Sequence, residues 1–341
     1  MLNRLFAGTV AAAAIATLCA APAARADAVS DFYKDKDITV VVAFGEGGGY
    51  SIYARTLAQF WGKHIPGHPN VIVQFMPGAG GVKAANYLFN VAPKDGSYVG
   101  MPSNSYALGQ ALQEGGIKYD AAEAYHLGRI DNMNSAIMVW HTAPATTLKE
   151  METKEVLFGG TGKASQDYMN PTLMKNLLGM KYRVVLGYTG SKEVNLAMER
   201  GEVHGMANSW ASVKSVMTQK LEKKELIPVA MVSLTPAPDA KHIPVVKDLA
   251  KTEEARDLLE LMASTTAVGR VFILPPGVPA DRAAALRKAF ADTMKDRDFI
   301  AEAEKRKMDL DPMSGEEVQK IVVKAAKTPA EMVAKFKKAI E

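Results

Sequence analysis

The stretch from Ile38 to Gly49 reads ITVVVAFGEGGG, a run of β-branched residues that leads into a glycine-rich loop. The run is apolar on both faces, which is typical of a parallel strand buried inside a sheet. After the loop, Tyr53, Leu57 and Trp61 recur at helical spacing. The loop is therefore expected to join a buried strand to an amphipathic helix.

The same scheme occurs a second time shortly afterwards. Residues 71–75, VIVQF, predict a strand, residues 77–81, PGAGG, form a second loop, and a helix follows from Val82. A third strand, 98–101, ends in a polar segment that contains Ser103 and Asn104. This alternation predicts an α/β fold with a mainly parallel sheet. Ligands of such sheets bind beyond the carboxyl ends of the strands, so both loops are expected to open on one crevice.

The two glycine loops are the candidate binding elements. Missing side chains let the backbone approach a ligand, and the free N–H groups that open the following helix donate to a carboxylate or phosphate. The pair of loops therefore predicts a bipartite pocket for negative oxygens. The alternative is that the glycines only serve tight strand-to-helix turns.

A second domain is expected from about residue 131. Residues 137–140, 156–158, 183–186 and 227–232 predict strands, and small polar clusters follow at 159–165, 187–191 and 207–210. The helix after the first cluster begins either at Ser165 or at Asn170-Pro171, since proline suits a first helical turn but kinks a helix interior.

The chain is then expected to return to the first domain. Residues 268–274 predict a strand, and three helices follow, two of them with capping-box patterns at Ser314 with Glu317 and at Thr328 with Glu331. Two crossing segments predict a hinged clamshell, with domain 1 formed by residues 27–130 and 255–341 and domain 2 by residues 131–254.

Residues 1–26 have the pattern of a secretory signal peptide, with Arg4, an alanine-rich apolar stretch, and a small-x-small site ending at Ala26. The periplasm is the expected location. The only cysteine, Cys19, lies in this segment, so the mature chain is expected to have no disulfide, thiol nucleophile or cysteine-bound metal. Removal of the segment leaves 39 basic and 37 acidic residues, a net charge of +2 that does not favour nucleic acid.

Several motifs together resemble one family. FGEGGG at 44–49 with Ala54-Arg55, MPGAGG at 76–81, APKDG at 92–96, GYTG at 187–190 and LPPGVP at 274–279 are similar to motifs of the Bug/TctC periplasmic solute-binding proteins of tripartite tricarboxylate transporters (TTT). The resemblance spans the mature chain. It implies a type II periplasmic-binding-protein fold, a small organic carboxylate as ligand, and the permease subunits of a TTT-type membrane transporter as transient partners of a monomer.

The resemblance also implies which residues bind the ligand. The two loops would hold one carboxylate through backbone amides and ordered water, while polar residues of domain 2 would select the rest of the ligand. With the rim residues and aromatic candidates added, the predicted ligand-binding set is Phe44, Gly47, Gly48, Gly49, Ser51, Gly78, Ala79, Gly80, Gly81, Ser103, Asn104, Thr161, Lys163, Ser165, Tyr188, Gly190 and Ser209.

Two positions depart from the family pattern. Ser51 stands where the family often has aspartate, and Glu46 stands where a small or apolar residue is usual. A carboxylate about 4 Å from a bound anion would oppose it by about 4 kcal/mol at an effective dielectric constant of 20. Either Glu46 points outward, or the ligand carries a cationic or hydrogen-bond-donating group.

An enzyme is the main rival class. The sequence contains no nucleophile elbow, zinc-protease pair or dinucleotide fingerprint, so no catalytic residue, metal ligand or cofactor is expected. His64 and His68 have a helical metal spacing, but Pro66 and Gly67 break the helix between them. Lys163 is either an exposed loop residue or a partner for a second carboxylate. A periplasmic sensor that signals to a membrane partner remains a further alternative.

Overall fold

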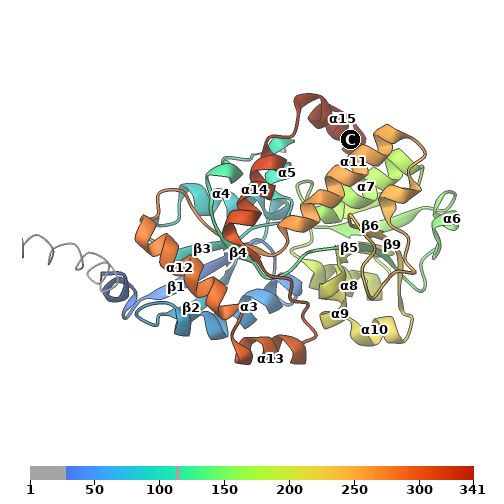
Figure 1. Ribbon diagram of the computed structural model, residues 1–341. Coiled ribbons are helices and arrows are strands. Elements are labelled where there is room, and N and C mark those ends of the chain that lie inside the picture. The colour runs from blue at the N-terminus through green and yellow to red at the C-terminus, as the bar shows by residue number, and fades with distance from the viewer. Residues whose placement is uncertain (1–27, 113–115) are drawn as a thin grey trace, which may run out of the picture.

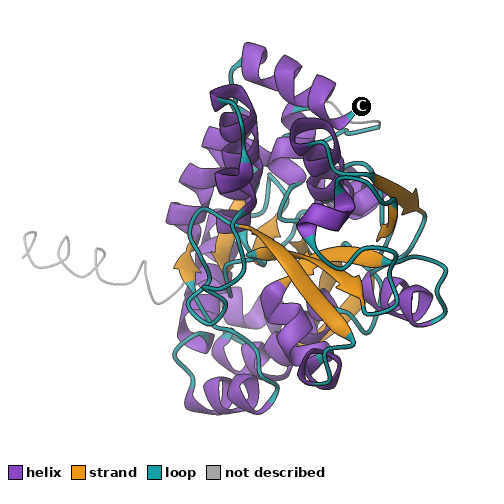
Figure 2. Cartoon of the chain, turned by 90° about the vertical axis from the view of Figure 1, so that its right-hand side faces the viewer, coloured by secondary structure: helices purple, strands orange, loops and turns teal. Residues whose placement is uncertain are grey.

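The computed structural model describes residues 28–112 and 116–341, and the predicted signal peptide lies outside them. This part of the chain forms two lobes, each built on one mixed sheet with helices packed around it (Figures 1 and 2). The predicted two-domain α/β fold class is confirmed.

The first lobe contains a six-stranded sheet in the order β11-β4-β10-β3-β1-β2. Strands β1, β2 and β3 run parallel, and β10 runs antiparallel to both β3 and β4. The strands are β1 (Asp37–Val42), β2 (Asn70–Phe75), β3 (Tyr98–Met101), β4 (Tyr125–Arg129), β10 (Val271–Leu274) and β11 (Met313–Ser314).

The second lobe contains a five-stranded sheet in the order β7-β6-β8-β5-β9. Strands β7, β6 and β8 are parallel, whereas β5 is antiparallel to both β8 and β9. The strands are β5 (Ser135–Trp140), β6 (Val156–Gly160), β7 (Tyr182–Leu186), β8 (Gly205–Ser209) and β9 (Leu226–Val232).

Antiparallel strands make both sheets mixed, although most strands of each sheet run in the same direction, as predicted. Strand β5 begins directly after the chain enters the second lobe, where Ser135 pairs with Ser209 at the carboxyl end of β8. Strand β10 begins directly after the return, where Val271 pairs with Arg129 at the carboxyl end of β4. A strand that starts where the chain crosses between the lobes runs away from that crossing. It is therefore antiparallel to the strands that end there.

Helices connect the strands. They are α3 (Gly49–Trp61), α4 (Val82–Asn90), α5 (Tyr106–Ala111), α6 (Leu148–Met151), α7 (Gln166–Leu178), α8 (Ser191–Glu199), α9 (Trp210–Val216), α10 (Thr218–Glu222), α11 (Glu253–Ser264), α12 (Ala280–Thr293), α13 (Arg297–Lys305), α14 (Gly315–Ala326) and α15 (Ala330–Ile340). None of the helices in the described residues is both long enough and apolar enough to cross a bilayer.

The core of the first lobe lies between its sheet and α3, as the opening stretch predicts. Tyr53, Leu57 and Trp61 are fully buried on one stripe of α3 and pack with Phe272 and Phe290. Burial of each such side chain contributes about 1.5–3 kcal/mol, so this stripe stabilises the packing of α3 in the core.

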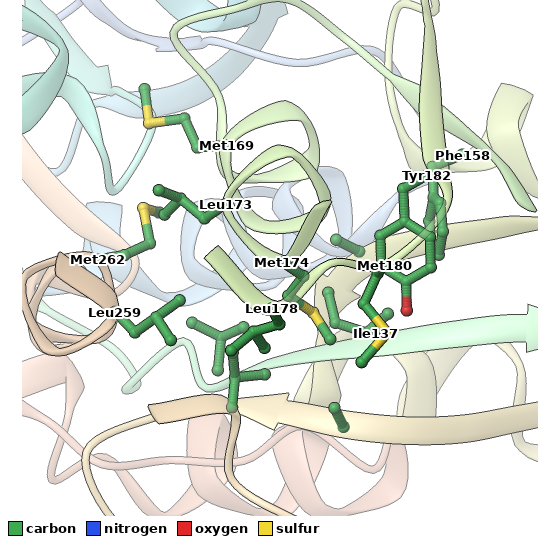
Figure 3. Close-up of a cluster of buried hydrophobic side chains, with 14 of the residues drawn as sticks. Ile137, Phe158, Met169, Leu173, Met174, Leu178, Met180, Tyr182, Leu259 and Met262 are labelled. Atoms are coloured by element: carbon green, nitrogen blue, oxygen red, sulfur yellow. The ribbon is translucent and has the colours of Figure 1, made fainter. Parts of the chain in front are cut away.

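The core of the second lobe packs α7 and α11 on the sheet. Figure 3 shows Met169, Leu173 and Met174 of α7 among the buried side chains, together with Met262 of α11. Methionine fills irregular gaps because its unbranched side chain is flexible. Met169, Met174 and Met262 fill the core in this cluster.

The chain crosses between the lobes at paired segments. The amide of Arg270 donates to the carbonyl of Asp131 at 3.1 Å, and the amide of Met133 donates to that of Thr266 at 3.0 Å. Helices α11 and α15 both pack on α7 in the second lobe (Figure 1). The predicted domains assign both helices to domain 1, so this packing differs from the prediction and adds a third crossing at residues 327–329.

Local sequence features determine where several helices begin. Ser165 caps α7, and Pro171 lies inside that helix, so the helix begins at the earlier of the two predicted positions. Ser314 and Glu317 form the predicted capping box of α14. The second predicted capping box is wrong, because the hydroxyl of Thr328 donates back to the carbonyl of Ala325 and α15 has no side-chain cap.

Candidate functional site

A cavity lies between the two lobes, at the carboxyl ends of their parallel strands. Its volume is about 60 Å³, several times the roughly 10–15 Å³ that one buried water needs. The first lobe and the crossing segment supply Phe44, Gly45, Gly48, Gly49, Tyr50, Asn104, Met133 and Ser135. The second lobe supplies Gly159, Thr161, Ser165, Gln166, Asp167, Ser191, Val194, Met206, Ala207, Asn208, Ser209 and Ser212.

The first glycine loop brings the start of α3 to this cavity. Gly48 is the N-cap, no side chain caps the helix, and its first turn contains no acidic residue. None of the described residues accepts a hydrogen bond from the amides of Gly48, Gly49 or Tyr50. Unpaired amides at a helix N-terminus carry partial positive charge and bind anions, so this end of the cavity suits a carboxylate.

The glycines also let the lobes meet. A Cβ added to Gly49 would lie 1.8 Å from Oγ of Ser212, and one added to Gly48 would lie 2.5 Å from Oγ of Ser191. The amide of Gly45 donates to the carbonyl oxygen of Thr189 at 2.8 Å. The structure is therefore a closed form in which second-lobe backbone and hydroxyls lie against the first loop.

The second glycine loop does not line the cavity. Residues 78–81 all have left-handed backbone angles, which tightens the loop before α4. A Cβ on Gly80 would lie 2.8 Å from the amide nitrogen of Ser165, and one on Gly162 would lie 2.3 Å from that of Gly80. In this closed form Ala79 and Gly80 contact the second lobe, Gly78 and Gly81 lie against first-lobe residues, and only the first loop supplies the predicted cradle.

The structure brings seven of the predicted ligand-binding residues to the cavity: Phe44, Gly48, Gly49, Asn104, Thr161, Ser165 and Ser209. Lys163 is exposed, Tyr188 packs on the second-lobe core, and Gly190 lies against the backbone of Gly45. Gly47 packs on the side chain of Lys192, while Ser51 and Ser103 are buried outside the lining.

Glu46 points away from the cavity. Its carboxylate pairs with Arg55, and both side chains are exposed. The outward orientation, which the sequence analysis left open, is therefore confirmed, and Glu46 places no charge in the cavity.

Sequence reasoning missed several cavity residues, most of them close to predicted ones. Gln166 and Asp167 follow Ser165 in the first turn of α7, Ser191 follows Gly190 at the start of α8, and Ser212 lies in the first turn of α9. The predicted start of each helix could have indicated these residues, because the first helical turn after a strand lies at the same edge of the cavity as the loop before it.

Asp167 is a buried acidic group in this lining. Its Oδ2 accepts a hydrogen bond of 2.7 Å from the hydroxyl of Thr161. Burial raises the pKa of Asp167 to about 6, although the hydrogen bond from Thr161 opposes that rise. Thr161, predicted as one of the second-domain residues that select the rest of the ligand, donates its hydroxyl hydrogen to Asp167 in this structure.

A buried ion pair lies behind the cavity wall. Arg270 and Asp131 are both fully buried where the crossing segments pair, and they contact each other directly. The guanidinium of Arg270 stacks over the ring of Tyr53 at 3.9 Å and donates to the hydroxyls of Ser209 and Ser212. Arg270 thus orients two cavity hydroxyls without lining the cavity, a role that no sequence pattern indicates.

Comparisons with known proteins are consistent with this geometry. No family model matches the chain, and no curated protein sequence does. Among solved structures, the periplasmic binding protein BugD gives a TM-score of 0.72 at 17% sequence identity, covering 90% of this chain and 98% of that one. A protein from R. palustris with adipate gives 0.70 at 20% identity, covering 89% and 98%.

MatC from Rhodopseudomonas palustris with bound malate gives a TM-score of 0.68 at 16% identity, covering 90% of this chain and 99% of MatC. At these identities the likeness concerns the fold, and it extends over nearly all of each chain. The resemblance expected from the sequence motifs is confirmed at that level: the chain has the two-lobed fold seen in BugD and related periplasmic binding proteins.

Proposed function

We propose that the chain is a Bug/TctC-type solute-binding protein that captures a small organic carboxylate between its lobes and delivers it to a TTT-type membrane transporter. The observation that carries this proposal is the uncapped N-terminus of α3, whose first residues line the closed cavity between the lobes. An anion held there would satisfy amides that no described residue satisfies.

Two further observations support a carboxylate over other anions. The cavity is small, and its lining offers several short hydroxyl side chains but none of the arginines or lysines that bind phosphate groups. Two structural neighbours were solved with adipate and with malate, which are both carboxylates. The neighbours are binding proteins, which favours a receptor over an enzyme.

The way the lobes close supports delivery to a membrane permease. The contacts of Gly45 with Thr189 and of Gly80 with the 162–165 segment form only when the lobes meet. Closure therefore creates a composite surface that a permease distinguishes from the open form. A periplasmic sensor would use the same surface, and only the identity of the membrane partner separates the two roles.

Calorimetric titration of the mature protein with a panel of mono-, di- and tricarboxylates tests ligand class. We expect at least one acid to bind and to raise the unfolding temperature, because a ligand that binds only the folded state stabilises it. Neutral sugars serve as the negative control. Binding of sugars, or of no acid at all, would contradict the proposal.

A further inference from the structure

One carboxylate oxygen of Asp167 receives no hydrogen bond from the residues that the structure describes. Oδ2 receives the hydroxyl of Thr161, but Oδ1 is enclosed and has no partner of hydrogen-bonding geometry. Ser165 already caps α7 by accepting from the amide of Asp167, so the helix does not require the second oxygen of the carboxylate. The carboxylate of Asp167, a residue of the cavity lining, therefore retains acceptor capacity that the described residues do not use.

The cavity also lacks a charge that would balance Asp167. The lining residues include no lysine, arginine or histidine, within the residues that the structure describes. Arg270, the buried cation behind the cavity wall, pairs with Asp131 and donates to serine hydroxyls, and Lys163 is exposed. A buried carboxylate without a cationic partner is costly unless another group pairs with it when the site is filled.

We infer that the ligand is an organic acid that also carries a hydrogen-bond donor, an ammonium or a hydroxyl group, and that Asp167 accepts from this donor while the acid's carboxylate binds the amides of α3. The inference rests on the proposed function and narrows its ligand class. The ligand's carboxylate brings a second negative charge into the cavity with Asp167, and an acid without a donor has no group on Asp167 to offset their repulsion.

The need for a hydrogen-bond donor on the ligand explains why an acidic side chain, Asp167, can lie in a site that binds acids. The carboxylate of the ligand binds at the first-lobe wall, on the residues that open α3, and the donor binds at the second-lobe wall, on the residue that opens α7. A ligand with both groups bridges the lobes and favours the closed form, whereas a ligand with only one group contacts one wall. Asp167 is thus a specificity-determining residue.

Matched acids test the inference. Titration calorimetry would compare propionate with lactate and alanine, succinate with malate and aspartate, and glutarate with 2-hydroxyglutarate and glutamate. Within each series the acids differ only in one substituent, so the hydroxyl and the ammonium are tested separately. For the series that fits the cavity, we expect wild-type protein to bind the hydroxy or amino acid at least about tenfold more tightly than the unsubstituted acid, equivalent to about 1.4 kcal/mol.

Asp167→Asn is the decisive variant, because it keeps the size of the side chain and the acceptor for Thr161 but removes the charge. We expect it to lose most of the preference for the donor-bearing acid while still binding the unsubstituted acid. Asp257→Asn, an exposed aspartate on α11, makes the same chemical change away from the cavity and is expected to bind like wild type. Circular dichroism would confirm that both variants are folded.

The outcomes separate the two proposals. If acids bind but the substituent makes no difference and Asp167→Asn changes nothing, the inference fails and the proposed function stands. Tighter binding of unsubstituted acids with uptake of a proton, measured in buffers of different ionisation enthalpy, would also overturn the inference, because Asp167 would then be a protonated donor. If no acid of any series binds, the proposed function fails and the inference with it.

Discussion

The amide of Gly45 donates to the carbonyl oxygen of Thr189 across the interface between the lobes, at 2.8 Å. This backbone contact lies beside the cavity and holds the lobes together next to the residues that open α3. Ligand capture therefore depends on how closely the two backbones approach, and substitutions of the glycines at the interface test that dependence.

Replacement of Gly49 by alanine should prevent closure. The added Cβ would lie 1.8 Å from Oγ of Ser212 and 2.9 Å from the guanidinium of Arg270, both of them buried. The backbone of Gly49 is helical, so alanine does not strain α3 itself. We expect the affinity for the best acid of the panel to fall by at least about 100-fold, or about 2.7 kcal/mol, with little change in helix content.

The matched control is Gly109→Ala. Gly109 lies in α5, and its added Cβ would make only ordinary contacts, the nearest at 3.7 Å to Ala164. Calorimetry would measure affinity and small-angle scattering would measure closure for both variants. Wild-type affinity in Gly49→Ala would show that closure does not need this contact.

Replacement of Gly80 by valine tests the second loop, which the structure places outside the cavity. The backbone of Gly80 is left-handed, and a Cβ there would contact the amide of Ser165. We expect weaker binding because the lobes are held apart, with little loss of secondary structure. If the loop were only a turn, affinity would stay unchanged once the folded fraction is taken into account.

The stability of the ligand-free protein should depend on pH through Asp167. Its pKa rises from an ordinary value of 3.8 to about 6 in the folded state, so the folded state binds the proton more tightly than the unfolded state. The contribution of Asp167 to stability is therefore greatest near pH 4, falls as pH rises towards 6, and stays low above that.

Asp167→Asn removes this dependence. We expect Asp167→Asn and wild type to differ little near pH 4.5, and Asp167→Asn to be more stable at pH 7.5 by up to about 3 kcal/mol. Urea unfolding at the two pH values measures the difference directly. An equal difference at both values, or a less stable asparagine variant at pH 7.5, would contradict the burial of the charge.

Removal of one partner of the buried ion pair behind the cavity wall should lower the free energy of unfolding. Arg270→Met leaves Asp131 buried without its partner, which we expect to cost about 3–5 kcal/mol of unfolding free energy. The double variant with Asp131→Asn should recover part of that loss, because no unpaired charge remains. Urea unfolding of both variants tests this, and a loss below about 1 kcal/mol in the single variant would show that water or another group compensates Asp131.

The sequence predicts the fold well where one pattern dominates. The buried run before the first glycine loop and the apolar stripe of α3 are both present, because strand burial and helical periodicity reflect the same core. Strand β4 escaped prediction, since its sequence YHLGR is mostly polar although four of its five residues are buried. His126 is satisfied there by the hydroxyl of Tyr106, at 2.6 Å, a contact that no local pattern reveals.

Only part of the candidate site can be predicted from the sequence. The residues that open α3 stand out because glycines cluster there, and the structure brings them to the cavity. Asp167 and Arg270 do not stand out, because an aspartate in a first helical turn and an arginine before a strand are ordinary in a sequence. Their importance depends on which groups lie opposite them once the lobes close, and that is decided by tertiary structure.

The central claim is that main-chain amides at the start of α3 bind the acid's carboxylate in the cavity between the lobes. Amide ¹H–¹⁵N spectra of the labelled mature protein, recorded during titration with the tightest-binding acid of the panel, test it most directly. The account predicts that the largest downfield proton shifts at saturation are those of Gly48, Gly49 and Tyr50. Saturation that leaves these three amides unmoved would contradict it.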